Sequence, residues 1–357
     1  MIAEYQYLWG TMARFLWPFC ASVFAVIVFT PLMIFIARRF NILDYPNARK
    51  IHTTPVPRLG GAALLLGFWI VALFNLPWTR EFLAMTAAGT IVGVMGIMDD
   101  VRTLSSRIRL VGQIVACAIV MSSGLVVSFM PKIWWGQVFA VFFTILWIVG
   151  ITNALNFSDG LDGLASGISF IASLFFFLVA IYLRQLPVAF AAALLAGSCL
   201  GFLVWNFKPA KIYLGDGGST FLGFMLACLA LYGGWSEHGW VIACGIPTII
   251  LGVLVFDMIY ITIARIKNGQ VRTFQEWLDF TGKDHFHHRL MSMGLSEVMA
   301  VVFIYLVCLI LGLNVLVLEK LHNPLAVTVL LIQSVMIFLV IFFLMRAGHA
   351  LKDTKKK

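Results

Sequence analysis

Long apolar stretches, separated by short polar segments, repeat along the whole chain. Eleven such stretches can be counted, near residues 14–37, 60–77, 82–98, 110–130, 137–153, 164–183, 188–206, 218–234, 240–263, 298–318 and 325–345. In lipid the backbone must satisfy its own hydrogen bonds, so each stretch predicts a membrane-spanning helix. The sequence therefore predicts an all-α fold, a polytopic membrane helix bundle of about eleven transmembrane helices.

The polar segments alternate in their content of Lys and Arg. With the N-terminus outside and the C-terminus cytoplasmic, 20 of the 25 Lys and Arg residues fall in cytoplasmic segments. Positive residues are enriched on the cytoplasmic side of membrane proteins, so this asymmetry predicts the orientation. We expect one domain, 1–357, whose site is formed by the cytoplasmic loops 38–59, 99–109, 154–163, 207–217 and 264–297.

Composition agrees with a membrane protein and excludes an ordinary soluble domain. Hydrophobic residues make up 61% and charged residues 11% of the chain, whereas soluble domains are about one-quarter charged. The net charge of +9 follows from the membrane orientation and gives no reason to expect a nucleic-acid partner. The six cysteines lie inside apolar stretches without a CxxC pair, which is typical of small buried side chains.

Acids, amides and histidines gather in the predicted cytoplasmic loops. In NALNFSDGLDGLASG (153–167), Asn153, Asn156, Asp159 and Asp162 recur every three residues. On an ideal α-helix they would spread over half the surface, whereas a tighter or glycine-broken path would align them. A simple turn needs only one or two such residues, so the spacing favours a ligand-binding strap.

Two carboxylates, Asp99 and Asp100, end the third stretch in GIMDD. A helix C-terminus is already negative, so this pair needs a nearby cation, which Arg102, a metal ion or a shared proton could supply. Asp216, in GDGGST, is either the cap of the next helix or a carboxylate that bridges a metal beside a glycine-rich phosphate site.

DHFHHRL (284–290) places three histidines and an arginine in one loop, with a spacing that fits no zinc motif. These side chains suit phosphate oxygens, although a plain basic loop would explain the arginine. Asp257 lies late in the ninth stretch and has either a functional or a structural partner. Oxygen ligands for a hard metal, basic groups for phosphate and a membrane location together predict phosphoryl transfer from a water-soluble donor to a lipid acceptor.

The chain resembles the polyprenyl-phosphate N-acetylhexosamine-1-phosphate transferases, and among them the bacterial undecaprenyl-phosphate GlcNAc-1-phosphate transferases. The resemblance covers nearly the whole chain. It includes DYPNARKIHTTPVPRLGG (44–61), GIMDD (96–100), NALNFSDGLDGLASG (153–167), WNFKPAKIYLGDGGSTFLG (205–223), Asp257 before Arg265, and DHFHHRL (284–290).

The resemblance implies that undecaprenyl phosphate attacks the sugar-bearing phosphate of a UDP-N-acetylhexosamine and releases UMP. It implies Mg²⁺, with Mn²⁺ as an alternative, near Asp216 and Asn156, and catalytic roles for Asp99 and Asp100. A phosphate monoester is already anionic near neutral pH, so Asp99 is ranked as a positioning or proton-accepting group above a nucleophile. The substrate-binding residues that it implies are Asp159, Asp162, Asn206, His285, His287, His288, Arg289, Asp44, Lys50 and Arg58.

The H-x-H-H-R loop and the PVPRLGG segment favour GlcNAc over UDP-MurNAc-pentapeptide as the sugar donor. The resemblance places the protein in a bacterial inner membrane, with its site on the cytoplasmic face, at the start of polysaccharide synthesis such as that of O-antigen or teichoic acid. A homodimer is compatible with the sequence. The rival interpretation is a secondary transporter, but transporters place polar sites near the midplane in paired repeats, and no repeat is visible here.

Overall fold

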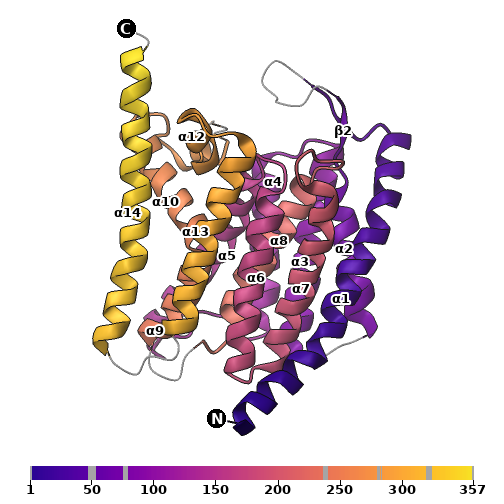
Figure 1. Cartoon of the computed structure of the whole chain (residues 1–357), viewed down its shortest axis with the longest axis vertical. Helices are drawn as coiled ribbons and strands as arrows, with labels where there is room; N and C mark the ends of the chain where they lie inside the picture. Colours follow the sequence, from indigo (N-terminus) through magenta and orange to yellow (C-terminus); the bar gives the residue numbers. More distant parts are fainter. Residues whose placement is uncertain are drawn as a thin grey trace. The chain divides into compact units, whose positions relative to one another are not determined.

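The computed structural model describes residues 2–46, 54–74, 79–235, 240–279, 282, 284–318 and 324–355. The described chain is helical almost throughout (Figure 1). It divides into two compact units, Met1–Gly234 and Trp235–Lys357, which are called unit 1 and unit 2 below.

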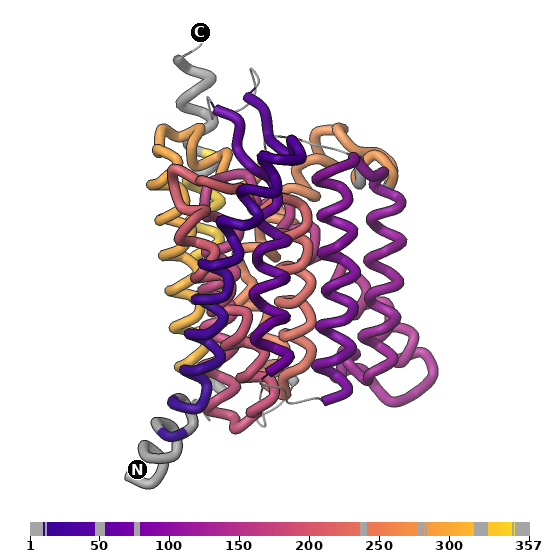
Figure 2. Tube along the Cα trace, turned by 90° about the vertical axis from the view of Figure 1, so that its right-hand side faces the viewer, coloured from indigo at the N-terminus to yellow at the C-terminus, as the bar shows by residue number. Residues whose placement is uncertain are grey.

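Unit 1 is built around one central helix. Its elements are α1 (Ile2–Arg39), β1 (Leu43–Asp44), β2 (Val56–Pro57), α2 (Gly60–Phe74), α3 (Arg80–Val101), α4 (Ser106–Ser122), α5 (Trp134–Ser158), α6 (Leu164–Tyr182), α7 (Leu186–Asn206) and α8 (Gly215–Tyr232). Helix α8 packs against α2, α3, α5, α6 and α7, and the helices of this unit run side by side in Figure 2. Every residue of α8 from Gly215 to Ala230 except Asp216 is buried, so this helix forms the core of the unit.

Glycines allow α8 to lie against its neighbours with the backbones in contact. A methyl group added at Gly61 of α2 would overlap the backbone of Gly218, and one added at Gly96 of α3 would overlap the backbone of Asp216. Small residues at helix interfaces permit such close approach in membrane proteins. The end of α3 that carries Asp99 and Asp100 is thereby brought against the start of α8.

A two-residue strand pair closes part of the first loop, which the sequence does not predict. Strands β1 and β2 are antiparallel, with Leu43 opposite Pro57 and Asp44 opposite Val56. The Arg58 amide donates to the Ile42 carbonyl at 3.2 Å, and the Tyr213 amide donates to the Pro57 carbonyl at 2.8 Å. This pair therefore links the end of α1 to the segment that leads into α8.

Unit 2 contains α9 (Trp240–Ile250), α10 (Gly252–Lys267), α11 (Phe274–Asp279), α12 (Phe286–Ser292), α13 (Glu297–Leu318) and α14 (Pro324–Lys355). Helix α13 packs against α9, α10, α12 and α14. The stretch 240–263 is not the single straight helix that its hydropathy suggests, because α9 and α10 meet at an 82° bend. Pro247, which lacks a backbone donor, and Gly252 flank the break at Leu251.

Each of the eleven apolar stretches coincides with a helix or with the bent pair, but the count of eleven crossings is not confirmed. By length and apolar composition, six described helices can span a membrane, or seven if the bent pair counts as one. Helices α2 and α4 have 15 and 17 residues, fewer than the roughly 20 that a bilayer core requires. The structure supports a multi-pass membrane protein, and the orientation of its termini stays a prediction.

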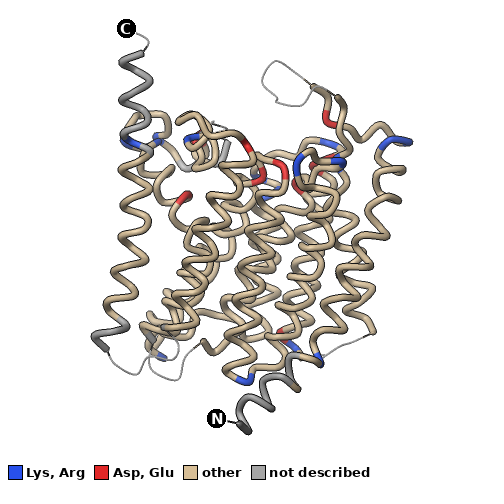
Figure 3. Tube along the Cα trace, in the orientation of Figure 1, with Lys and Arg blue, Asp and Glu red and all other residues tan. Residues whose placement is uncertain are grey.

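Charged residues in unit 1 gather mainly at one end of the bundle. Figure 3 shows most of the acidic and basic positions of this unit at the end where α3 and α5 finish and α8 begins. The helices between the two ends carry few charges, as expected for segments surrounded by lipid. This charged end is where the candidate site lies.

The contact between Gly96 and α8 gives a test of the packing. Gly96→Ala would force α3 and α8 apart, and we expect a loss of about 1–3 kcal/mol of stability, the usual cost of overpacking. The measurement is the apparent melting temperature of the purified protein in detergent. Gly150→Ala in α5 is the matched control, because a methyl group there meets nothing within 4 Å. Equal melting temperatures for the two variants would contradict the close packing.

Candidate functional site

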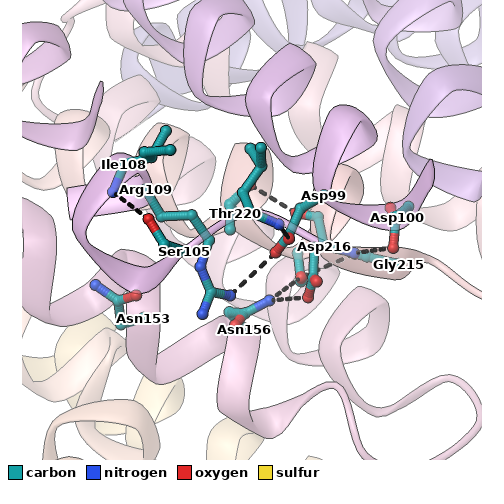
Figure 4. A network of polar contacts seen from close by, with 12 residues as sticks. Asp99, Asp100, Ser105, Ile108, Arg109, Asn153, Asn156, Gly215, Asp216 and Thr220 are labelled. Carbon is teal, nitrogen blue, oxygen red and sulfur yellow. Dashed lines mark hydrogen bonds and ion pairs between the residues drawn. The ribbon is translucent and has the colours of Figure 1, made fainter. Parts of the chain in front are cut away.

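Five of the predicted site residues come together at the charged end of unit 1. Asp99 and Asp100 lie at the end of α3, Asn156 in the last turns of α5, Asp159 at the C-cap of α5, and Asp216 in the first turn of α8. Figure 4 shows Asp99, Asp100, Asn156 and Asp216 in one polar network. We call these five residues the carboxylate cluster.

Asp100 binds the start of α8 with both of its carboxylate oxygens. Oδ1 accepts a hydrogen bond from the Asp216 amide at 3.0 Å, and Oδ2 accepts one from the Gly217 amide at 3.0 Å. The guanidinium of Arg58 lies 3.3 Å from Oδ1, and it also approaches Asp44 at 3.7 Å. The cation beside Asp100 is thus Arg58 and not Arg102.

Asp99 has different partners. Its Oδ1 accepts the Leu104 amide at 2.5 Å, and its Oδ2 pairs with Arg109 at 3.1 Å. Its carboxyl group also interacts directly with that of Asp216. Two neighbouring aspartates on one helix therefore differ in their partners: both oxygens of Asp100 accept amides of α8, whereas Asp99 accepts one backbone amide and pairs with Arg109 through its other oxygen.

Asn156 holds Asp216 in place. Its side-chain amide donates to Oδ1 of Asp216 at 2.7 Å and to the Ser219 hydroxyl at 2.9 Å. Asp216 is not the cap of α8, because the cap position is Leu214 and no side chain bonds there. The capping task falls to Asp100, and Asp216 is left to face the cluster.

In the described part of the chain, the four carboxyl groups of the cluster have only two cations paired with them, Arg58 and Arg109. Desolvation, followed by the charges of Asp216 and Asp100, raises the pKa of Asp159 well above its usual range. The contact between the Asp99 and Asp216 carboxyl groups is unfavourable unless a proton or a cation lies between them. The oxygen donors fit a hard divalent cation such as Mg²⁺. Among the described residues, however, no group of three or more acidic, histidine or cysteine side chains is arranged as a complete metal site.

The polar strap 153–162 takes a path different from the predicted one. Asn153 and Asn156 lie on a regular α-helix that continues to Ser158, since no glycine lies between Gly150 and Gly160 and Asn156 bonds to Asp216 and Ser219 of α8. The break comes only at Asp159, and Gly163, with φ of 78°, is the N-cap of α6. The four residues therefore do not align on one tightened path.

Asp162 and Asn206 fasten the loop that connects α7 to α8. Asp162 accepts the Ala210 amide at 3.0 Å and lies 3.7 Å from Lys208. Asn206, which is buried, accepts from the Gly163 amide and the Ser166 hydroxyl and donates to the Ile212 carbonyl at 3.0 Å. Both side chains are engaged within the protein, so their contact with a nucleotide stays a prediction.

A cleft beside the cluster shows residues that sequence reasoning missed. Its lining consists of Val92, Met95, Gly96, Arg109, Gln113, Asn153, Asn156, Asp216 and Thr220. The Asn153 amide donates to Gln113 Oε1 at 2.9 Å, which links α5 to α4. Gln113 is a polar residue inside an apolar stretch, and this feature of the sequence could have identified it as a candidate site residue. No feature of the sequence identifies Arg109, because its partner Asp99 is ten residues away across a helix boundary.

Two buried charges of unit 2 hold the start of the histidine segment. Asp257 accepts the Phe286 amide at 2.8 Å and pairs with His285 Nδ1 at 2.9 Å. Arg265 forms two hydrogen bonds with Asp284, both at 2.8 Å, and these bonds keep the pKa of Asp284 below its usual value despite its partial burial. Asp257 thus has a structural partner within unit 2.

The remaining residues of this segment follow in α12. His287 is buried, its Nε2 makes no hydrogen bond, and burial lowers its pKa well below the usual range, so its ring stays neutral at physiological pH. The His288 ring packs against that of His287 with centroids 4.2 Å apart. Arg289 lies 4.7 Å over the Tyr260 ring. Among the other predicted residues, Lys50 lies outside the described part of the chain.

Arg265 provides a test of this arrangement. Arg265→Gln leaves Asp284 without its cation, and we expect a loss of about 3 kcal/mol, the lower end for a broken buried ion pair, because Asp284 keeps some access to water. Apparent melting in detergent, with limited proteolysis of the 270–290 region, measures the change. Lys267→Gln, an exposed charge two residues away on the same helix, is the control. If both variants behave alike, the ion pair does not hold the segment.

Comparison with known proteins places the cluster inside a defined family segment. The family model described as glycosyl transferase family 4 matches residues 82–234, which include the whole carboxylate cluster. The chain is 36% identical over 315 residues to the probable undecaprenyl-phosphate N-acetylglucosaminyl 1-phosphate transferase of Bacillus subtilis, covering 87% of this chain and 86% of the relative.

Two further relatives are named for related activities. The decaprenyl-phosphate N-acetylglucosaminephosphotransferase of Mycobacterium leprae is 33% identical, over 78% of this chain and 77% of its own. The phospho-N-acetylmuramoyl-pentapeptide-transferase of Lactobacillus johnsonii is 30% identical, over 78% of this chain and 91% of its own.

Proposed function

We propose that this chain, which belongs to the polyprenyl-phosphate sugar-phosphate transferases of glycosyl transferase family 4, acts on UDP-GlcNAc and undecaprenyl phosphate. An oxygen of the lipid phosphate attacks the sugar-bearing phosphorus of the donor. The bond to the UMP phosphate breaks, UMP leaves, and a lipid diphosphate sugar is formed. This product starts cell-envelope polysaccharide synthesis, at the cytoplasmic face of a bacterial inner membrane.

One observation carries this proposal. A cluster of carboxylates with Arg58 and Arg109 lies at one end of an apolar helix bundle, where a lipid phosphate and a soluble nucleotide can both arrive. Phosphoryl transfer needs positioning and charge neutralisation more than covalent help. Acidic and basic side chains gathered at one end of the helix bundle are suited to that task.

Divalent metal is part of the proposal, and the residues fit it. Asp216 and Asn156 would hold Mg²⁺, or Mn²⁺ in its place, and the ion would neutralise charge on the transferring phosphate. Asn156 fixes the orientation of the Asp216 carboxylate. Asp99 accepts or steers the proton of the lipid phosphate, and Arg109, which lines the cleft, offsets the negative charge beside it. The second pKa of a phosphate monoester is about 6, so the lipid phosphate is largely deprotonated at neutral pH and needs little help from a strong base.

Donor binding is assigned to the remaining predicted residues. Asp159, Asp162 and Asn206 shape the nucleotide side, the last two by fixing the loop after α7. His285, His287, His288 and Arg289 bind the diphosphate or sugar, and Asp44, Lys50 and Arg58 belong to the first loop. No finding supports the homodimer that the sequence permits, so none is proposed.

Two alternatives differ in their predicted reaction. UDP-MurNAc-pentapeptide remains a second candidate donor, because the Lactobacillus johnsonii relative is named for that substrate. A transporter would place polar groups near the middle of the bundle, whereas the cluster of unit 1 lies at the helix ends.

UMP release distinguishes these candidates. We expect the purified protein, with UDP-GlcNAc, Mg²⁺ and undecaprenyl phosphate, to form UMP and a lipid-linked sugar in equal amounts, because the two products come from one bond cleavage. A panel with UDP-GalNAc and UDP-MurNAc-pentapeptide measures the preference. UMP formed only with the pentapeptide donor would overturn the GlcNAc assignment, and no UMP with any donor would overturn the transferase proposal.

Substitution of Asp216 should reduce turnover more than substitution of any other residue of the cluster. Asp216→Asn removes the charge that the metal requires, and we expect turnover to fall on the order of 10²–10³-fold or more, with weaker dependence on Mg²⁺. UMP release across a Mg²⁺ titration measures this. Glu81→Gln, in the first turn of α3 and so at the opposite end of that helix from Asp99 and Asp100, is the control and should leave turnover unchanged. Wild-type turnover in Asp216→Asn would remove Asp216 from the mechanism.

A further inference from the structure

The two neighbouring aspartates at the end of α3 do not have the same surroundings. We propose that Asp100 is a positioning residue that holds the N-terminus of α8 together with Arg58 and thereby sets the Asp216 carboxylate, rather than a group that touches the lipid phosphate. The inference rests on the proposed function, since it assigns a task within that reaction.

Both oxygens of Asp100 are used by the backbone. They accept the amides of Asp216 and Gly217, two consecutive residues in the first turn of α8, each at 3.0 Å. The first amides of a helix have no partner within the helix, and a carboxylate there also interacts favourably with the helix dipole. Asp100 therefore does for α8 what a capping side chain usually does, but from another helix, 116 residues earlier in the chain.

The space around Asp100 is filled. Its side chain is 1% exposed, and a methyl group added at Gly215 would lie 2.5 Å from its Oδ2. Gly215 also has φ of +72°, so this position suits glycine on both counts. A substrate phosphate could reach Asp100 only by displacing Arg58 or the start of α8.

Arg58 completes the arrangement from the first loop. Its guanidinium lies 3.3 Å from Asp100, which offsets the buried negative charge. The backbone around it is tied to the segment before α8, because the amides of Gly60 and Gly61 donate to the carbonyls of Tyr213 and Leu214 at 3.0 and 2.8 Å. The cation, the carboxylate and the helix end are therefore held as one assembly.

Asp99 is the contrasting case. Its Oδ1 accepts the Leu104 backbone amide, but its Oδ2 pairs with Arg109, a side chain that lines the cleft, and its carboxyl group interacts with Asp216. An arginine side chain can exchange a carboxylate partner for a phosphate, whereas the backbone amides that bind Asp100 cannot move away without unwinding α8.

The test compares Asp100→Asn with Asp99→Asn in the full-length protein in detergent. Asparagine keeps the size of the side chain but removes the charge and one of the two acceptor oxygens. For Asp100→Asn we expect three results: a Mg²⁺ concentration for half-maximal UMP release raised about 10–100-fold, an unchanged shape of the pH–rate profile, and a lower melting temperature without Mg²⁺. Faster amide exchange at the start of α8, also without Mg²⁺, should accompany them.

For Asp99→Asn we expect lower turnover with the half-saturating Mg²⁺ concentration changed less than in Asp100→Asn. Arg58→Gln is the second variant, because it leaves the Asp100 carboxylate and its hydrogen bonds in place. It should raise the Mg²⁺ requirement in the same direction, and the double variant Arg58→Gln/Asp100→Asn should cost less than the sum of the two single changes. Glu81→Gln again controls for the loss of a carboxylate outside the cluster.

Two outcomes would overturn the assignment. One is an Asp100→Asn protein that loses a limb of the pH–rate profile while its Mg²⁺ requirement and melting temperature stay at wild-type values, since Asp100 would then act as a proton acceptor. The other is an unchanged Mg²⁺ requirement in Arg58→Gln. If the wild type releases no UMP from any donor, the proposed function fails, and the melting and amide-exchange measurements still decide whether Asp100 holds α8.

Discussion

The start of α8 has to satisfy its backbone amides inside a tightly packed helix bundle, and much of the geometry of unit 1 answers that requirement. Helix α8 is the core of the unit, and its first turn lies against glycines of α2 and α3 where no side chain of its own could fit. An unsatisfied amide in such a place costs on the order of several kcal/mol. Asp100 meets the requirement from α3, so the helix end and the carboxylate pair are brought together by one interaction.

Satisfying those amides with a carboxylate has an electrostatic consequence. It places the Asp100 carboxyl group beside those of Asp99, Asp159 and Asp216. These four carboxyl groups are accompanied by two cations, Arg58 and Arg109. Like charges in a poorly hydrated site favour a bound cation or proton. The interaction that holds the start of α8 therefore also gathers carboxyl groups at this end of unit 1, so the core and the candidate site depend on one small set of residues.

The sequence predicted much of this arrangement, because hydropathy is a local signal. All eleven apolar stretches correspond to helices or to the bent pair, and the predicted site residues Asp99, Asp100, Asn156, Asp159 and Asp216 lie together at one end of unit 1. The bend at Leu251 was missed because proline and glycine are also tolerated in straight membrane helices. Spacing alone also misled for Asn153 and Asn156, since the packing of α5 on α8 keeps them on a regular helix.

The tasks of individual residues were harder to predict than their membership of the site. Asp100 and Asp216 are 116 residues apart, and no local pattern shows that one caps the helix of the other. The same limit applies to Arg109 and Gln113, whose partners Asp99 and Asn153 lie on other helices. A pattern of residue types shows which groups are available, whereas the packing of distant segments decides which atoms of those groups stay available to a ligand.

Unit 2 repeats the same use of buried charge. Asp257 and Arg265 do not leave their polar atoms open to a ligand, because Asp257 binds the Phe286 amide and His285, and Arg265 binds Asp284. In both units, acidic and basic side chains that look catalytic by composition hold the backbone that presents other residues. Loss of activity on substitution is thus expected for both kinds of residue and cannot separate them. Only measurements that respond differently to metal affinity, proton transfer and folding can assign the charges of such a site.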